Sequence, residues 1–190
     1  MSLRKLITEN YKEAVDEVVN LIEARLDNNR LTFQDITDEY ESLGEGTEAK
    51  VYEVNGKALR VESPATRYKE EIYEKLKGNE FEHVVKVEYN KVVKIGAIYY
   101  LLTVMEKLEP IDDNNKINQL NHLSDKYHFP YEGDLNEFED IKDIIININR
   151  GVKELEEEGI NPTDIWTDNI MYDPKTDKYK IIDILDKNIR

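Results

Sequence analysis

The sequence predicts an α+β protein in which an antiparallel sheet precedes a smaller helical region. Short apolar runs flank Asn55-Gly56, a dipeptide typical of a two-residue β-hairpin. Further along, the apolar residues of segment 136–158 recur every three or four positions, which indicates an amphipathic helix. A chain of 190 residues accommodates one domain, or two small lobes that share a cleft.

The composition excludes several classes of function. The net charge of −15 disfavours a nucleic-acid or anionic-membrane partner, because both need a basic surface. No apolar run reaches membrane-spanning length and no signal peptide opens the chain, so we expect a cytoplasmic protein without a membrane partner. The absence of cysteine excludes disulfides, thiol catalysis and cysteine-based zinc sites.

Residues 1–36 are predicted to form an N-terminal amphipathic helix. Its apolar stripe consists of Ile7, Tyr11, Val15, Val18, Ile22 and Leu26. Such a stripe needs a partner surface, in this chain or in another. Packing against its own domain is favoured, and a partner-binding helix is the alternative.

Residues 37–108 are predicted to form the sheet, with about five strands and one helix. The helix is expected over 67–77, because apolar residues gather on one of its sides and Gly78 is a natural stop. The apolar runs that predict the strands are 51–54, 58–61, 84–87, 92–95 and 98–105.

Residues 109–190 form the second predicted region. It opens with a polar linker over 111–134 that holds one short helix. The 136–158 helix follows, with Asp134 and Glu137 at capping-box spacing before it and Gly159 after it. Two short strands come last, at 170–172 and 179–182.

The early hairpins carry residues suited to phosphate. Gly44 and Gly46, separated by one residue, let a backbone bend closely over phosphates and offer N–H groups to them, although an ordinary tight turn would look the same. Arg60, on the strand after the Asn55-Gly56 hairpin, would direct a cation at the α- and β-phosphates. Glu70 and Glu71 are alternative partners for Arg60, and the sequence leaves that choice open.

The late loop carries residues suited to Mg²⁺ and to proton transfer. Asp164 can accept a proton from an attacking hydroxyl, whereas Asn169 and Asp183 offer the oxygen ligands that hard cations prefer. Between the two regions, Glu106 to Leu108 form a short connector of the kind in which an adenine ring finds backbone donors and acceptors.

Over residues 40–186 this order of motifs resembles the eukaryotic-type protein kinase superfamily, including its compact bacterial and small-molecule members. The resemblance implies a two-lobed kinase-like fold, with an antiparallel N-lobe sheet over 37–108 and a much reduced helical C-lobe over 109–190. It implies ATP and Mg²⁺ as cofactors, Asp164 as the catalytic residue, and Asn169 and Asp183 as metal ligands. The nucleotide-binding residues that it implies are Gly44, Gly46, Val51, Arg60, Glu70, Met105 at the gatekeeper position, and Glu106 and Leu108 in the hinge.

The sequence also departs from the family pattern. The positions that differ are Ala49 for the third loop glycine, Arg60 for the usual lysine, Pro162-Thr163 for His-Arg, Trp166 for the catalytic-loop lysine, and Asp183-Ile184-Leu185 for Asp-Phe-Gly. The sequence stops at Arg190, soon after this last motif, so we expect no activation segment. These losses bear on phosphotransfer more than on the fold.

The sequence therefore leaves three alternative functions. The first is a minimal kinase that transfers the ATP γ-phosphate to a hydroxyl of a protein or small molecule. The second is a weak or inactive pseudokinase that acts as a nucleotide- or protein-binding module, and the third is an unrelated α+β domain. Residual kinase activity or nucleotide binding is favoured, because Asp164, Asn169 and Asp183 are acceptor-type groups that repel in one cleft unless a cation lies among them.

Overall fold

The computed structural model describes Asn20 and residues 40–46, 49–95, 97–127, 129–163 and 165–186. It confirms an α+β protein with a five-stranded antiparallel sheet. The chain divides into two compact units, which are described separately below: the first unit comprises residues 1–78 and 87–107, and the second unit comprises residues 79–86 and 108–190. No helix in the described ranges is long and apolar enough to cross a membrane.

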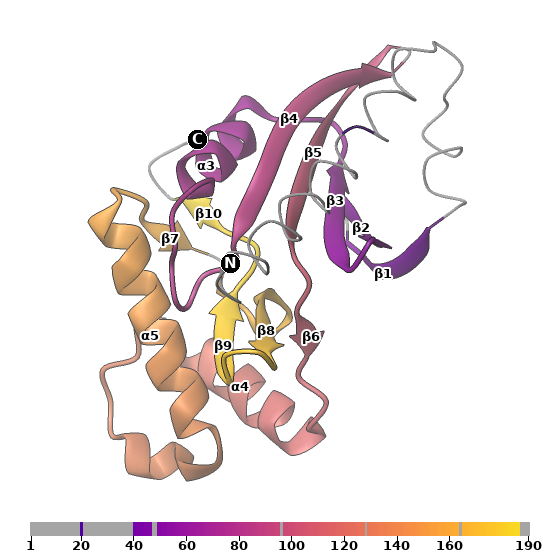
Figure 1. The fold of residues 1–190 in the computed structure, drawn as a ribbon. Coiled ribbons are helices and arrows are strands. Elements are labelled where there is room, and N and C mark those ends of the chain that lie inside the picture. The colour runs from indigo at the N-terminus through magenta and orange to yellow at the C-terminus, as the bar shows by residue number, and fades with distance from the viewer. Residues whose placement is uncertain are drawn as a thin grey trace, which may run out of the picture. The chain divides into compact units, whose positions relative to one another are not determined.

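The first unit is built on one sheet with strand order β1-β2-β3-β5-β4 (Figure 1). Every neighbouring pair is antiparallel. The predicted hairpin at Asn55-Gly56 is confirmed, since both residues have the positive φ, 49° and 74°, that a type I′ turn requires. The strands are β1 (Glu41–Glu45), β2 (Ala49–Val54), β3 (Lys57–Glu62), β4 (Val87–Ile95) and β5 (Ile98–Glu106).

The prediction of separate strands at 84–87 and 92–95 is wrong. β4 is continuous from Val87 to Ile95, and Val84 makes only an isolated bridge. The polar Asn90, which interrupts the apolar pattern, finds one partner outside the sheet and one inside it. Its Nδ2 donates to the helical Glu70 carbonyl at 3.1 Å and its Oδ1 accepts from Thr103 Oγ1 of β5 at 3.1 Å, so the buried amide is satisfied.

The predicted helix over 67–77 is confirmed as α3 (Arg67–Leu76). Thr66 caps its N-terminus by accepting from the Lys69 amide, and Gly78 follows its C-terminus with a φ of 85°. The helix buries Ile72, Tyr73 and Leu76, and its closest packing is against β4.

The second unit is mainly helical and carries short strands at its C-terminal end (Figure 1). The predicted 136–158 helix is in fact two elements, the 3-10 helix η1 (Leu135–Ile141) and α5 (Lys142–Glu157), because Ile141 before α5 is non-helical at φ −120°, ψ 11°. Phe138 also leaves the helical region, at φ −130°, ψ 43° inside η1. Asp134 is the expected cap, and accepts from the Asn136 amide at 2.9 Å. The other elements are β6 (Glu109–Pro110), α4 (Asn114–Lys126), β7 (Pro162–Thr163), η2 (Thr167–Asn169), β8 (Ile170–Asp173), β9 (Lys178–Ile181) and β10 (Leu185–Asp186).

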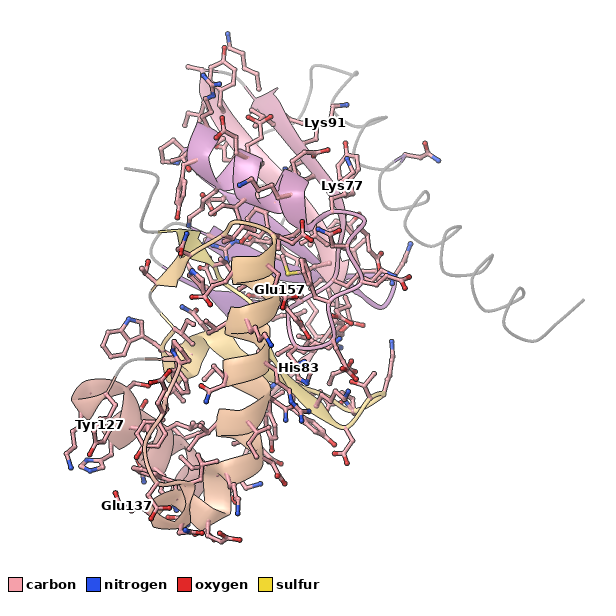
Figure 2. All side chains as sticks on the ribbon, turned by 90° about the vertical axis from the view of Figure 1, so that its left-hand side faces the viewer. Lys77, His83, Lys91, Tyr127, Glu137 and Glu157 are labelled. Carbon is pink, nitrogen blue, oxygen red and sulfur yellow. The ribbon has the colours of Figure 1, made fainter. Side chains whose placement is uncertain are left out.

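Residues 79–86 belong to the second unit although they lie between α3 and β4 in the sequence. His83 lies beside α5 (Figure 2), where its amide and its Nδ1 contact the two Glu154 carboxylate oxygens at 3.0 and 2.8 Å. Val84 forms a parallel bridge with Ile181 of β9. Gly151 of α5 permits this close packing, since a Cβ there would lie 2.7 Å from the His83 carbonyl oxygen.

Candidate functional site

The sheet register places three of the predicted nucleotide-binding residues on one line. Gly44 of β1 is opposite Val51 of β2, and Val51 is opposite Arg60 of β3. Adjacent strands lie about 4.8 Å apart, so Gly44 and Arg60 are separated by roughly 10 Å across the sheet. Val51 and Arg60 also share a face, because directly paired residues point to the same side.

The fold of the first unit does not itself require glycine at position 44 or 46. Neither residue has a positive φ. A Cβ on Gly44 would meet no described atom within 4 Å, and one on Gly46 would meet only the Ala49 carbonyl oxygen at an ordinary 3.7 Å. Close approach of a ligand to the backbone is a reason for glycine that these observations leave in place.

Arg60 is buried in a charged cluster on the face of the sheet that α3 covers. Its Nη2 donates to Glu62 Oε2 at 3.1 Å, and the same oxygen lies 3.2 Å from Lys69 Nζ. The Arg60 guanidinium also lies over the Tyr73 ring, 5.9 Å from its centroid. All three charged side chains are at most 10% exposed, and together they carry one positive charge.

Arg60 pairs with Glu62, which is neither of the two predicted partners, Glu70 and Glu71. Glu71 accepts from Arg67 Nε on the exposed side of α3, and Glu70 offers its backbone carbonyl to Asn90. The helix contributes the cation Lys69 to the cluster, and the strand contributes the acid. Glu62 was not singled out from the sequence, although a residue two positions from Arg60 on a strand must share its face.

The predicted gatekeeper and hinge residues lie at the end of β5 and directly after it. Met105 is buried on β5, opposite Ala58 of β3. Glu106 ends the same strand, is half-buried, and is opposite Lys57. Leu108 is buried and belongs to the second unit, so the predicted hinge coincides with the point at which the chain leaves the first unit.

The second unit brings the two predicted metal ligands together. Asn169 ends η2, immediately before β8, and its carbonyl accepts from the Ile182 amide at 3.0 Å. Ile170 and Ile181 pair directly, so Asn169 and Asp183 lie at the same end of the β8–β9 hairpin. Both are half-buried, and Asp183 Oδ1 is shielded from solvent.

Asp164, the predicted catalytic residue, lies outside the described residues. Its neighbour Thr163 is described, and pairs with Leu185 through the β7–β10 ladder. Strand pairing therefore ties the chain just before Asp164 to the chain just after Asp183. Trp166, which stands where the family has a lysine, is 46% exposed.

The turn between β8 and β9 is held by a buried carboxylate. Asp173 accepts from the Lys175 amide, from Thr176 Oγ1 and from Lys180 Nζ, the last at 2.9 Å. Burial alone would raise the pKa of Asp173, but these hydrogen bonds and the Lys180 charge outweigh burial and lower it below its ordinary value. The carboxylate is thus a structural anchor for the hairpin that presents Asn169 and Asp183.

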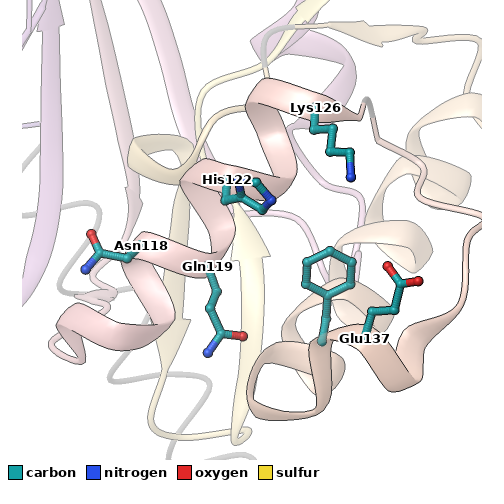
Figure 3. Close-up of a pocket in the computed structure, with 6 residues that line it drawn as sticks. Asn118, Gln119, His122, Lys126 and Glu137 are labelled. Carbon is teal, nitrogen blue, oxygen red and sulfur yellow. The ribbon is translucent and has the colours of Figure 1, made fainter.

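Two pockets lie within the second unit, and none of the predicted site residues lines either of them. One has a volume of about 390 Å³ and opens between α4 and η1 (Figure 3). Its lining residues are Asn118, Gln119, His122, Lys126, Glu137 and Phe138. The other, of about 340 Å³, lies along α5 and includes His83, Asn147 and Lys178 in its lining.

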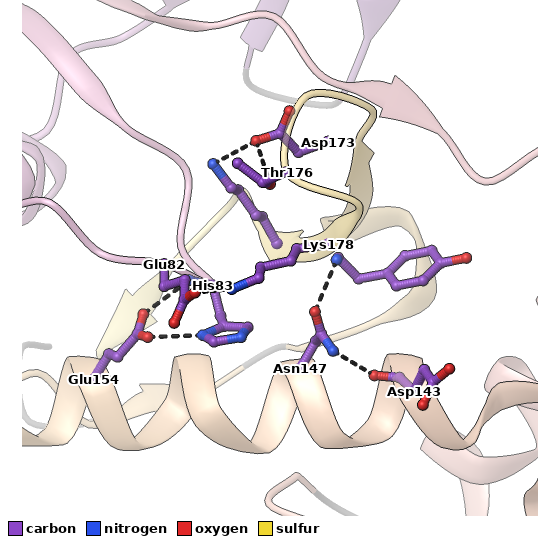
Figure 4. Close-up of polar contacts among 10 residues, drawn as sticks. Glu82, His83, Asp143, Asn147, Glu154, Asp173, Thr176 and Lys178 are labelled. Carbon is purple, nitrogen blue, oxygen red and sulfur yellow. Dashed lines mark hydrogen bonds and ion pairs between the residues drawn. The ribbon is translucent and has the colours of Figure 1, made fainter.

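Glu82, His83 and Glu154 are the only described residues whose carboxylate and imidazole atoms gather as metal ligands would, all within 4.8 Å of one another. The sequence did not indicate this group. Lys178 forms an ion pair with Glu82, and His83 is already engaged by Glu154 (Figure 4). A neighbouring cation and an existing hydrogen bond both oppose a metal ion here, so the contacts fit an anchor for residues 79–86 better.

No protein-family model matches the sequence, and no curated protein matches it. Any function proposed for the chain therefore depends on the geometry of its own residues. In the first unit, the glycine turn and the Arg60 cluster are suited to an anion. In the second unit, Asn169 and Asp183 are suited to a hard cation.

Proposed function

We propose that this chain is a minimal kinase-like protein that binds ATP with Mg²⁺ and transfers the γ-phosphate to a hydroxyl of a protein or small molecule. The observation that carries this proposal is the register of Gly44, Val51 and Arg60 on one line of the sheet. The order of elements supports it as well, because a five-stranded sheet interrupted by α3 precedes a helical unit whose C-terminal part holds the β8–β9 hairpin.

Each unit would supply a different part of the chemistry. The backbone at Gly44 would allow close approach of the phosphate oxygens, whereas the Gly46 amide already donates to the Ala49 carbonyl at 2.8 Å, and Arg60 would balance the phosphate charge. Asn169 and Asp183 would hold Mg²⁺, whose role when bound is to neutralise charge on the phosphates. Asp164 would orient the acceptor hydroxyl and take its proton, mostly by positioning, since a carboxylate of ordinary pKa is a modest base.

The second candidate is a pseudokinase that binds nucleotide or protein without phosphotransfer. It is favoured by the direct bond between Arg60 and Glu62, because a carboxylate on the phosphate-binding cation weakens its pull on an anion. The exposed Trp166 favours it too, since the charge that would stabilise the γ-phosphate is missing at that position.

Thermal unfolding of the purified chain with ATP, with and without Mg²⁺, tests nucleotide binding. At a hundredfold excess of free nucleotide over Kd, binding stabilises the folded state by about 2.7 kcal/mol. We expect a rise in the midpoint that is larger with Mg²⁺, and expect Asp183→Ala to remove the Mg²⁺-dependent part. Asp168→Ala, an exposed aspartate of η2, is the matched control and should leave it intact.

The two candidates then separate by a phosphotransfer assay. Incorporation of radiolabelled phosphate that Asp164→Asn abolishes supports the kinase. ATP binding without such incorporation supports the pseudokinase. If ATP stabilises neither the Mg²⁺-loaded nor the Mg²⁺-free protein, both nucleotide proposals are wrong.

A further inference from the structure

The cavity of about 340 Å³ along α5, called the α5 cavity below, is lined by residues of the second unit alone. Its size falls in the range of pockets that bind small molecules. Asp143, Asn147 and Arg150 line it from one face of α5, since they are three and four positions apart. His83 lies over the same face, because its Nδ1 contacts Glu154, one turn beyond Arg150.

His83 brings an unsatisfied acceptor to this cavity. Its side chain is 2% exposed and lines the cavity, yet its Nε2 is buried without a hydrogen-bond partner among the described residues. The Glu154 carboxylate accepts from the His83 amide and from Nδ1, so the ring proton is on Nδ1 and Nε2 carries a lone pair. In Figure 4 the ring lies between Glu154 and Asn147. A buried acceptor of this kind calls for a donor.

The charged residues of the lining are distributed unequally along α5. β9 runs beside the helix, with the Tyr179 amide bound to Asn147 and Ile181 close to Gly151, so Asp177 belongs to the end where α5 begins. That end holds four carboxylates and one lysine: Glu139, Asp140, Asp143, Asp177 and Lys116. The other end holds Arg150 and Lys178, of which Lys178 pairs with Glu82.

Asp143 and Arg150, one at each end of the α5 cavity, have no ion pair with any residue that the structure describes. Both are exposed. They are seven residues apart on one helix face, which separates them by about 10 Å along the helix axis. Together with His83 Nε2, they offer a ligand one negative charge, one positive charge and one acceptor.

We propose that the α5 cavity binds a small molecule with one carboxylate and two ammonium groups, as in a basic amino acid. Its carboxylate would pair with the planar guanidinium of Arg150, its α-ammonium would donate to His83 Nε2, and its distal ammonium would pair with Asp143. Because Nε2 is shielded in this structure, this contact requires a neighbouring side chain to shift, and Lys178 is a long, flexible one beside His83 (Figure 4).

Ordered water is the competing occupant, since water could also satisfy Nε2. The opposite charges at the two ends favour the ligand, because water does not require them. The proposal concerns the second unit alone and does not depend on nucleotide binding.

L-Lysine and three analogues that each lack one group test the proposal on the full chain. Cadaverine lacks the carboxylate, ε-aminocaproate lacks the α-ammonium, and norleucine lacks the distal ammonium. By isothermal titration we expect L-lysine to bind at least about tenfold more tightly than each analogue. No binding of L-lysine would leave the cavity to water and overturn the proposal. Equal affinities for L-lysine and cadaverine would also overturn it, since attraction to the acidic chain would then suffice.

Matched variants assign each charge of the ligand to its residue. Asp143→Asn should weaken L-lysine at least about fivefold and leave norleucine within about twofold, and Arg150→Gln should do the same for L-lysine and cadaverine. Glu156→Gln and Lys153→Gln make the same charge changes at exposed positions on another face of α5, and each should alter the affinity for L-lysine by less than about twofold. Equal losses from Asp143→Asn and Glu156→Gln would contradict the proposal.

NMR of nitrogen-labelled histidine rings reports on His83 without replacing this buried residue. The chain has three histidines, and His122→Gln and His128→Gln identify the other two signals. We expect the His83 ring to be protonated at Nδ1 and its Nε2 signal to move when L-lysine is added. A Nε2 signal that stays in place at saturating L-lysine would show that His83 does not hold the ligand.

Discussion

The Arg60 guanidinium and the Glu62 carboxylate lie 3.1 Å apart, two residues from each other on the same buried strand. The acid that engages the predicted phosphate-binding cation is therefore supplied by β3 itself. Lys69 of α3 shares that acid at 3.2 Å, so Glu62 is the centre of the cluster. Its removal would take away the acid that both cations contact.

Glu62→Gln is expected to destabilise the folded chain by about 3 kcal/mol, because it removes the charge of a buried carboxylate that both Arg60 and Lys69 contact. Urea unfolding at neutral pH measures the loss. The same variant should regain more stability from added ATP than the wild type does, since the Glu62 charge no longer competes with the phosphates for Arg60. Glu71→Gln, in an exposed pair with Arg67, should cost less than about 0.5 kcal/mol and is the control.

Gly44→Val is expected to leave the fold intact and to weaken ATP binding at least about tenfold. A side chain there meets no described atom but would occupy the space that a phosphate needs beside the backbone. Isothermal titration with Mg²⁺–ATP measures the affinity, and unfolding curves check the fold. Ser42→Val, on the same strand, should leave the affinity unchanged. A Gly44→Val protein that binds ATP like the wild type would show that the glycine turn does not hold phosphate.

Asp164→Asn is expected to abolish phosphotransfer while leaving ATP affinity within about twofold, because an amide keeps the shape of the side chain but cannot accept the proton. Without a lysine at Trp166, wild-type turnover should also fall below the common kinase range of about 1–100 s⁻¹. Single-turnover assays with radiolabelled ATP measure both. Equal rates for the wild type and Asp164→Asn would eliminate this role.

Gly151→Ala is expected to destabilise the second unit by about 1–2 kcal/mol. Helix propensity alone predicts a gain of about 1 kcal/mol for this change. The new Cβ, however, would lie 2.7 Å from the His83 carbonyl oxygen and 3.1 Å from Ile181 Cδ1, and overpacking a core costs about 1–3 kcal/mol or more. Lys153→Ala, at an exposed position of the same helix, is the control and should change stability by less than about 0.5 kcal/mol.

Asp173→Asn is expected to cost about 2–3 kcal/mol at pH 7, since the buried ion pair between Asp173 and Lys180 is lost. The pKa of Asp173 is lowered in the folded state, so its contribution is present above the ordinary aspartate pKa of about 3.9 and is lost as the pH falls below that value. The stability difference between wild type and variant should therefore shrink in acid. Unfolding curves of both proteins, taken from pH 7 to pH 3, measure this difference, and a difference that stays constant over that range would contradict the prediction.

Local sequence signals predicted the presence of turns and helices better than the points at which helices and strands begin, break or end. The Asn55-Gly56 turn and α3 with its glycine stop follow from backbone chemistry that acts over a few residues, and both are confirmed. The break before α5 at Ile141 is not marked in the apolar pattern, and the continuity of β4 depends on tertiary partners, such as the Asn90–Thr103 hydrogen bond, which no local pattern contains.

In the candidate site, too, local patterns predicted some residues, whereas others become evident only from tertiary packing. Spacing along the chain predicted residues that the fold then gathers within each unit, namely Gly44, Val51 and Arg60 in one and Asn169 and Asp183 in the other. Glu62 and Lys69 were not predicted as site residues, because charged residues are usually solvated. Only the contacts between α3 and β3 show that these two are buried. Asp164 lies outside the described residues, so its role stays a prediction.

The bridge between Val84 and Ile181 joins positions almost a hundred residues apart in the sequence. On a translating ribosome, residues 83–85 emerge long before β9 exists to pair with them, and β4 and β5 of the first unit are made in between. The backbone groups and three buried side chains of this segment must wait until β9 has been synthesised. We therefore expect nascent chains that stop before β9 to expose Val84 and Val85 and to depend on chaperones.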